Sequence, residues 1–208
     1  MSKLHIMDHP LILHKITLLR DKNTDHINFK QLVEEVSSLI CYKATEDALT
    51  HDIEVETPMT KTIGKEMAQK YGIIPIMRAG MGMLDGIVKL MPTAKIGHIG
   101  LYREPRTLEP IEYYCKLPKD ISEREVLLLD PMVGTGGSAS SAITFLKERG
   151  VKNIKLLAII TCDPGVKLIH KLHPDVIIYT AAHDMILDDK GYVIPGMGDA
   201  GDRLYGTQ

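Results

Sequence analysis

Five short apolar runs in the middle of the chain constrain its fold more than any other feature. Each run ends at a turn or a charged residue, and helix-like segments near residues 80–91, 138–149 and 164–172 lie between them. The runs cover residues 72–77, 94–101, 126–129, 154–161 and 176–181. Continuously apolar strands that alternate with helices are typical of a parallel sheet whose two faces are both buried. We therefore expect an α/β fold, with a central, mostly parallel sheet and helices on both faces.

Two outer features complete the predicted architecture. Residues 10–20 and 29–43 repeat apolar side chains at intervals of three and four, so we interpret about 10–43 as N-terminal cover helices. Residues 111–117 instead alternate apolar side chains with Glu, Tyr and Lys, which is the period of a half-exposed strand. We expect residues 103–117 to form a flap hairpin that stands off the main sheet.

Composition and charge narrow the class of protein. The chain has 208 residues, 44% of them hydrophobic, and no repeat or linker divides it, so we expect one domain over residues 1–208. Its formal net charge of -2 gives no sign of a nucleic-acid partner. Cys41, Cys115 and Cys162 form no CxxC pair, which argues against a zinc site and a disulfide framework. No apolar run reaches the length of a membrane span, and we expect a cytoplasmic protein without a membrane partner.

Ligands of open parallel sheets bind outside the carboxyl ends of the strands, where one segment stands out. In VLLLDPMVGTGGSA, residues 126–139, Asp130 follows a buried strand and precedes a glycine-rich loop and a helix. The unpaired N–H groups and positive dipole of such a helix start bind phosphate. A carboxylate beside them suits ribose hydroxyls, or Mg²⁺ held through water. The loop therefore predicts a phosphorylated ribose as ligand.

Other interpretations of this loop stay open. Gly134, Gly136 and Ala139 also satisfy the GxGxxA pattern of a dinucleotide-binding dehydrogenase, in which Asp163 would bind the ribose of NAD. A glycine-rich turn without a ligand is the structural alternative. A Walker A loop is excluded because no Gly-Lys-Ser/Thr follows.

Arg78 is the second candidate, because it follows the strand at 72–77 beside Ala79 and Gly80. A planar guanidinium among free backbone amides suits pyrophosphate, since both donate hydrogen bonds to its oxygens. An arginine that only pairs with a local acid such as Asp85 is the alternative.

Two further segments carry candidate residues. Arg103 begins the charged, proline-containing segment 103–117, whose composition is that of a mobile flap or of a solvated hairpin. Residues 191–207, GYVIPGMGDAGDRLYGT, contain five glycines, which favours a folded loop over a flexible tail. A C-terminal turn that only packs against the core is the alternative.

These four segments resemble one known family. The strand, acid and Thr-Gly-Gly-Ser of VLLLDPMVGTGGSA resemble the 5-phosphoribosyl-1-pyrophosphate (PRPP) motif of type I phosphoribosyltransferases, in the form found in the uracil phosphoribosyltransferase family. PIMRAGMGM, LYREPR and YVIPGMGDAGDR are similar to that family's pyrophosphate loop, mobile loop and uracil-binding end, in the same order. Pro131 stands where the wider superfamily has a second acid, and Gly134 where the uracil branch usually has alanine.

The resemblance implies a type I phosphoribosyltransferase-like fold and the conversion of uracil and PRPP to UMP and pyrophosphate in pyrimidine salvage. It implies catalytic roles for Asp130, Arg103 and Asp199. The residues implied to bind PRPP are Arg78, Arg103, Asp130, Pro131, Met132, Val133, Gly134, Thr135, Gly136, Gly137, Ser138 and Asp199. The residues implied to bind uracil lie in the C-terminal segment (about 183–208) and are Val193, Gly198, Asp199 and Ala200.

The resemblance also implies Mg²⁺ as cofactor, held mainly by pyrophosphate and water, with Asp199 as a candidate ligand. It implies a homo-oligomer, a dimer or tetramer, with GTP as a candidate effector. None of the nine histidines is assigned a role. A regulator that keeps this fold but binds RNA stays open as the alternative from another functional class, although the near-neutral charge speaks against it.

Overall fold

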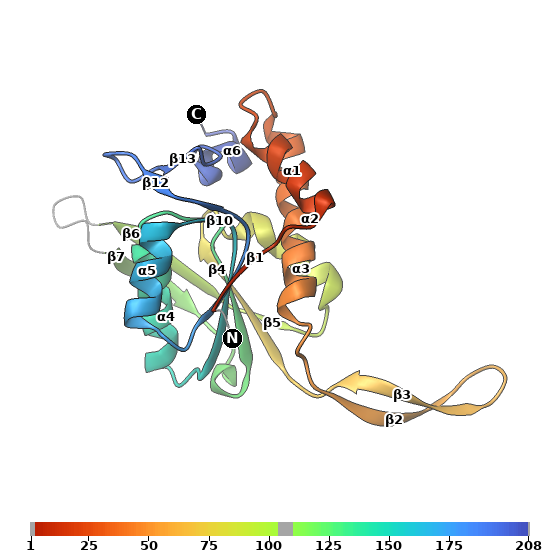
Figure 1. Ribbon diagram of the computed structural model, residues 1–208. Coiled ribbons are helices and arrows are strands. Elements are labelled where there is room, and N and C mark those ends of the chain that lie inside the picture. Colours follow the sequence, from red (N-terminus) through yellow and green to blue (C-terminus); the bar gives the residue numbers. More distant parts are fainter. Residues whose placement is uncertain (1–2, 104–109, 208) are drawn as a thin grey trace.

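The computed structural model describes residues 3–103 and 110–207, and its centre is one twisted sheet (Figure 1). In these residues the sheet has the order β1-β11-β10-β8-β4-β6-β7, with β5 beside β4 and β9 beside β10. Neighbouring strands along this path are parallel from β1 to β6, and only β7 runs antiparallel. The strands are β1 (Leu4–Ile6), β4 (Tyr71–Met77), β5 (Lys95–Ile96), β6 (His98–Arg103), β7 (Pro110–Lys116), β8 (Glu125–Leu129), β9 (Met132–Val133), β10 (Asn153–Cys162) and β11 (Ile177–Asp184). The predicted mostly parallel sheet is confirmed.

Helices cover both faces of this sheet, as predicted. Figure 1 shows α4 and α5 on one face and α2 and α3 on the other, with α1 beside α2. They are α1 (Pro10–Arg20), α2 (His26–Ala44), α3 (Met81–Leu90), α4 (Gly137–Glu148), α5 (Asp163–Leu172) and α6 (Ala200–Tyr205), with a 3-10 turn at Ile121–Glu123. Among the described residues, none of these helices has the length and apolar character needed to cross a membrane.

The core explains why the apolar runs are continuous. Along β8, Leu127 and Leu129 join the core on the side of α1, α2 and α3, whereas Val126 and Leu128 join the core on the side of α4 and α5. Successive side chains of a strand point to opposite faces, so a strand buried on both faces has no polar position. All four side chains are fully buried.

Two details differ from the sequence-based expectation. The run at 94–101 is broken into β5 and β6 at Gly97, where a Cβ atom would lie 2.8 Å from Ile74 and 2.9 Å from Leu117. Of the expected flap 103–117, the described residues Pro110–Lys116 form β7, which pairs along β6 as the edge strand of the sheet. Residues 104–109, the tip of the expected flap, lie outside the described residues.

A separate hairpin extends away from the body of the protein and was not predicted. It consists of β2 (Thr50–Glu56) and β3 (Lys61–Met67), which pair antiparallel with each other only (Figure 1). Because nearly every side chain of both strands is exposed, they lack the one-sided apolar pattern by which a strand is usually recognised. A second short hairpin, formed by β12 (Ile186–Leu187) and β13 (Val193–Ile194), lies near the C-terminus.

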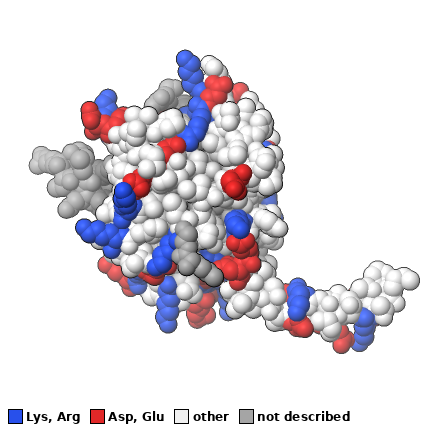
Figure 2. Space-filling view, viewed as in Figure 1, with Lys and Arg blue, Asp and Glu red and all other residues white. Residues whose placement is uncertain are grey.

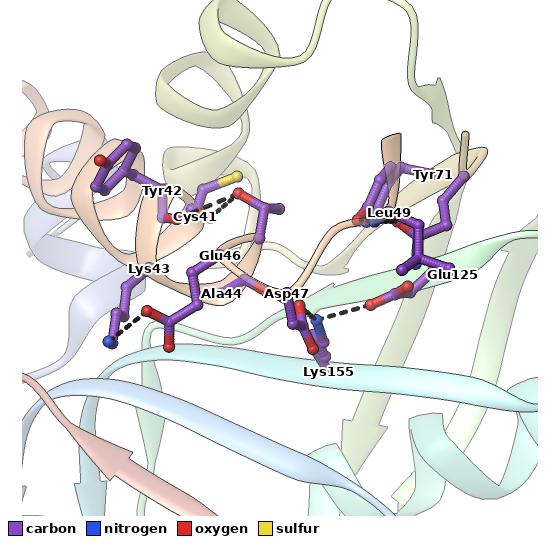
Figure 3. A network of polar contacts seen from close by, with 12 residues as sticks. Cys41, Tyr42, Lys43, Ala44, Glu46, Asp47, Leu49, Tyr71, Glu125 and Lys155 are labelled. Carbon is purple, nitrogen blue, oxygen red and sulfur yellow. Dashed lines mark hydrogen bonds and ion pairs between the residues drawn. The ribbon is translucent and has the colours of Figure 1, made fainter. Parts of the chain in front are cut away.

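A buried polar network ties the start of β10 to the loop after α2 (Figure 3). The Lys155 ammonium, whose side chain is 7% exposed, lies 2.6 Å from the Asp47 carboxylate and 2.9 Å from that of Glu125. It also donates a hydrogen bond of 2.8 Å to the Ala44 carbonyl oxygen. Burial favours a lower pKa of Lys155, but the hydrogen bonds to both carboxylates outweigh it and raise that pKa. The lysine therefore stays charged and joins the α2 end to the sheet.

Acidic and basic side chains are interspersed over the face shown in Figure 2. This agrees with the small net charge of the chain.

Candidate active site

A cleft of about 420 Å³ lies beyond the carboxyl end of β8. Four separate segments of the chain line it. They are Ala79, Asp130 with residues 132–139, residues 190–193, and residues 198–201. The cleft thus brings together the loop that follows Asp130 and the C-terminal segment, which are more than 50 residues apart in the sequence.

The loop from Asp130 to Ser138, here called the phosphate loop, is packed tightly from behind and open in front. Gly136 has φ +81°, and a Cβ atom there would lie 2.6 Å from the Gly165 carbonyl oxygen at the start of α5. At Gly137, the first residue of α4, the nearest atom to such a Cβ would be Thr135 Oγ1 at 3.8 Å. Among the described residues only the Thr135 hydroxyl, which accepts a hydrogen bond of 3.5 Å from the Gly137 N–H, comes near this position, so the start of α4 has room for a phosphate.

Backbone hydrogen bonds to β10 hold the base of the phosphate loop. The Asp130 N–H donates to the Leu157 carbonyl oxygen, and the Pro131 carbonyl oxygen accepts from the N–H groups of Ile159 (3.2 Å) and Ile160 (3.0 Å). Pro131 is buried beneath the loop and does not line the cleft, whereas Asp130 does.

The C-terminal segment forms the opposite wall. Asp188 holds the turn of the β12–β13 hairpin, since its Oδ1 accepts from the N–H groups of Lys190 (2.9 Å) and Tyr192 (2.8 Å). The two walls almost touch: a Cβ atom at Gly134 would lie 3.1 Å from the Gly191 carbonyl oxygen. The four predicted uracil-binding residues, Val193, Gly198, Asp199 and Ala200, all line the cleft.

Asp199 has a second role at this wall. Its Oδ1 accepts a hydrogen bond of 2.9 Å from the Asp202 N–H and so caps α6. Its other oxygen makes no hydrogen bond with any residue that the structure describes. One carboxylate oxygen is thus structural, and the other is available to a ligand in the cleft.

Arg78 lies next to the cleft rather than in its wall. Its side chain is 62% exposed, its Nη2 is 3.7 Å from Asp202 Oδ1, and it borders a smaller hollow of about 210 Å³ beside Tyr113 and Tyr205. The Tyr205 hydroxyl donates a hydrogen bond of 3.0 Å to the Arg78 carbonyl oxygen, and burial raises the pKa of Tyr205, which keeps this donor protonated. The pairing with Asp85 that the sequence left open is not formed.

The structure leaves one predicted site residue undetermined and places another elsewhere. Arg103 is the last residue of β6, at the carboxyl end of the sheet, but its side chain lies outside what the structure describes. Asp163, the ribose acid of the dinucleotide interpretation, pairs with Lys167 on α5 at 2.7 Å.

Six cleft residues were not named as site residues: Ala79, Ala139, Gly201 and, within the segment 183–208 that was predicted to bind uracil, Lys190, Gly191 and Tyr192. The last three belong to the β12–β13 hairpin, whose turn is the Asp-Asp-Lys-Gly sequence 188–191. Asp and Gly are typical turn residues, so this hairpin could have been recognised from its turn. Its strands are two residues long, and this is too short for an alternating pattern.

The acidic residues of the cleft fit Mg²⁺ bound together with a phosphorylated ligand. No cluster of three or more His, Cys, Asp or Glu in the described residues could hold a metal by itself. Asp130 and Asp199 both line the cleft. Mg²⁺ is usually bound by one or two carboxylates, substrate phosphates and water, so two carboxylates beside an open phosphate loop are sufficient.

Known proteins similar to this chain have the same family and fold. Curated uracil phosphoribosyltransferases from Finegoldia magna and Desulfitobacterium hafniense are 57% and 56% identical to it over the full length of both chains. A solved protein from Aquifex aeolicus is 34% identical with a TM-score of 0.92, and the match covers 99% of each chain. Adenine phosphoribosyltransferase from Trypanosoma brucei is 13% identical with a TM-score of 0.62 over 92% of this chain and 88% of its own, which shows the common fold.

The model of the uracil phosphoribosyltransferase family matches residues 6–207, nearly the whole chain. With the full-length identity to its relatives, this match shows that the chain belongs to the uracil phosphoribosyltransferase family.

Proposed function

We propose that the protein transfers the 5-phosphoribosyl group of PRPP to uracil, giving UMP and pyrophosphate, as an enzyme of pyrimidine salvage. The observation that carries this proposal is that one cleft contains both the phosphate loop and the C-terminal segment. Family membership supplies the substrates, and the cleft supplies a place where a phosphorylated sugar and a base can meet.

The phosphate loop would anchor the 5-phosphate of PRPP. In front of Gly137 only Thr135 Oγ1, among the atoms compared, comes within 4 Å of an added Cβ atom, and the start of α4 adds its positive dipole, so backbone N–H groups of this loop would bind the phosphate. Asp130 at the base of the loop would accept hydrogen bonds from the ribose hydroxyls. Holding the sugar at both ends fixes its C1 atom under the base, and most of the rate would come from this positioning.

The C-terminal segment would read the base with its backbone. Uracil has two carbonyl acceptors on either side of the N3–H donor, so main-chain N–H, C=O and N–H groups around Val193 and Gly198–Ala200 complement its edge. Cytosine has an amino group and a ring nitrogen there, and the resulting unpaired buried groups would disfavour it by several powers of ten. This pattern also stabilises a uracil anion, so the proposal needs no dedicated general base.

Breaking the bond from ribose C1 to pyrophosphate puts positive charge on the sugar and negative charge on the leaving group. Arg78 and Arg103 would stabilise the departing pyrophosphate, with Mg²⁺ neutralising part of its charge. Asp199, or Asp130 through water, would contribute the carboxylate ligand. Met132 and Val133 shape the floor of the cleft.

Four further features belong to the same proposal and are supported by the family resemblance. They are a single domain over residues 1–208, assembly as a dimer or tetramer, activation by GTP and a cytoplasmic location. Sedimentation of the purified protein and assays with and without GTP would test the assembly and the activation.

The decisive experiment offers the purified protein PRPP and Mg²⁺ with uracil, cytosine, hypoxanthine or orotate in separate reactions. The nucleotide and the pyrophosphate formed are measured by chromatography. We expect UMP from uracil alone, and no product once the metal is removed with EDTA. Product from another base would retain the PRPP site and refute the assignment of the C-terminal segment, whereas no product from any base would refute the proposed reaction.

A further inference from the structure

An ion pair outside the cleft binds the backbone of the C-terminal segment through the N–H and the C=O of one residue, Gly196. Arg20, the last residue of α1, forms a bidentate salt bridge with Asp184, with N–O distances of 2.7 and 2.8 Å. The same guanidinium donates a hydrogen bond of 2.8 Å to the Gly196 carbonyl oxygen, and Asp184 Oδ2 accepts one of 3.0 Å from the Gly196 N–H. Both backbone polar groups of Gly196 are thus bound by this pair.

The pair is largely removed from water, and this favours a fixed geometry. The Asp184 side chain is 7% exposed and that of Arg20 is 24% exposed. Burial raises the pKa of Asp184, but the hydrogen bonds from Arg20 and the Gly196 N–H prevail and hold that pKa below its usual value. Bidentate arginine–carboxylate salt bridges fix the orientation of the two side chains as well as the distance between them.

Gly196 has no side chain that could anchor it, and no larger residue fits at its position. It has φ +56°, and a Cβ atom there would lie 2.2 Å from the Val193 carbonyl oxygen. A larger residue therefore cannot replace the glycine and anchor the chain through a side chain. The hydrogen bonds to Arg20 and Asp184 therefore help to fix the position of Gly196.

A second arginine holds the next residue to the same helices. Arg203 lies over the Phe29 ring of α2, with its Cζ 4.2 Å from the ring centre. Its guanidinium donates to four carbonyl oxygens, those of Leu19, Asp21, Thr24 and Met197. The backbone at residues 196–197 is therefore tied to α1 and to the turn between α1 and α2.

The held residues lie between the two parts of the C-terminal segment that line the cleft. Val193 precedes Gly196 by three residues and Gly198 follows it by two. A shift of Gly196 would be passed on to both of these cleft residues, because so few bonds separate them from it. At a reacting site a displacement of about 1 Å costs roughly 100-fold in rate.

We propose that Arg20 and Asp184 are positioning residues that set the base-reading backbone and thereby the preference for uracil. The inference rests on the proposed function, because it takes residues 193–200 as the base site. It gives the N-terminal helices a task beyond covering the sheet. A purely structural role of the pair predicts a loss of stability without a selective loss of uracil binding.

The test compares Arg20→Lys, Arg20→Gln and Asp184→Asn with the wild type. Arg20→Lys keeps a charge beside the buried carboxylate but loses the planar fork, so it is the variant best able to fold. Lys15→Gln is the matched control, because Lys15 lies on the same helix and pairs with Glu35 of α2, away from the cleft. For each variant, kcat and the KM values for uracil and PRPP are measured, with cytosine as competing base and the melting temperature as a measure of folding.

We expect Arg20→Lys to raise KM for uracil by about 10- to 100-fold, the usual effect of losing a hydrogen bond to a charged group. Its KM for PRPP should stay within about twofold of the wild type. Its selectivity, the ratio of kcat/KM for uracil to that for cytosine, should fall. Lys15→Gln should change neither KM. A parallel rise of both KM values, or a lower melting temperature with unchanged KM for uracil, would overturn the inference. If the wild type itself makes no UMP, the proposed function fails first and the inference fails with it.

Discussion

The two walls of the cleft are held in place by different means. The phosphate loop is fixed by neighbouring backbone: β10 binds its base, and the close approach of Gly136 to Gly165 fixes its back. The C-terminal segment is fixed by side chains, and the hydrogen bond from Arg20 to Gly196 spans 176 positions of the sequence. One wall is therefore held by backbone contacts among residues 130–165, and the other by side chains that are distant in the sequence.

Because the phosphate loop is so tightly packed from behind, we expect it to be the part of the site most sensitive to an added methyl group. Gly136→Ala would push a methyl group to 2.6 Å from the Gly165 carbonyl oxygen and strain a residue at φ +81°. We expect kcat/KM for PRPP to fall by roughly 100-fold or more, because the loop has to move. The control is Gly150→Ala, which has the same strain at φ +83° but lies at the far end of α4. Similar kinetic losses in both variants would show that the effect is general destabilisation.

The second largest loss of activity is expected from a change of Asp130, whose carboxylate lies at the base of the phosphate loop. Asp130→Asn keeps the shape of the side chain but weakens its acceptance of ribose hydroxyls, so we expect kcat/KM to fall about 10- to 100-fold. Circular dichroism should show an unchanged fold. Near-normal turnover would remove Asp130 from the site.

Gly137→Ala separates an effect on protein packing from an effect on the space available to the ligand. Among the described residues, apart from the chain neighbours and the backbone of α4, the added methyl group meets no atom closer than 3.8 Å, so the melting temperature should not fall. It would occupy the space proposed for the 5-phosphate, and we expect KM for PRPP to rise about tenfold. An unchanged KM would mean that the phosphate does not bind in front of α4.

Arg78→Ala tests whether the residue beside the cleft serves one substrate only. Because its guanidinium is proposed to contact pyrophosphate, PRPP affinity should fall about tenfold, with uracil affinity changed much less. Equal losses for both substrates would contradict this role.

The smallest kinetic effect is expected at the opposite end of the sheet, in the Lys155 network. Lys155→Met leaves the Glu125 side chain, 11% exposed, without its buried partner, so we expect about 3 kcal/mol less stability with unchanged KM values. The raised pKa of Lys155 makes its contribution complete below the unfolded value of about 10.4 and lost as the pH rises through the folded value. Urea unfolding of the wild type between neutral and strongly alkaline pH should show this loss, and the variant should lack it.

The sequence predicted the parts of the fold whose signal is local. The strand at 126–129 and the helix after it were expected at 126–129 and 138–149, and the structure has β8 at 125–129 and α4 at 137–148. Strands buried on both faces and glycine-rich helix starts are recognisable without their neighbours. The β2–β3 hairpin was missed because its exposed strands bury too little for any one-sided pattern to show.

By itself the sequence determined the parallel sheet, the glycine-rich loop between Asp130 and the following helix, and the family, since these depend on contiguous residues in a recognisable order. Only the tertiary structure decided which distant residues complete the site: that Gly165 backs the phosphate loop, that the β12–β13 hairpin closes the cleft, and that Arg20 holds Gly196. The physical reason is that close approach and hydrogen-bond geometry depend on positions in space, and separation along the chain does not record them.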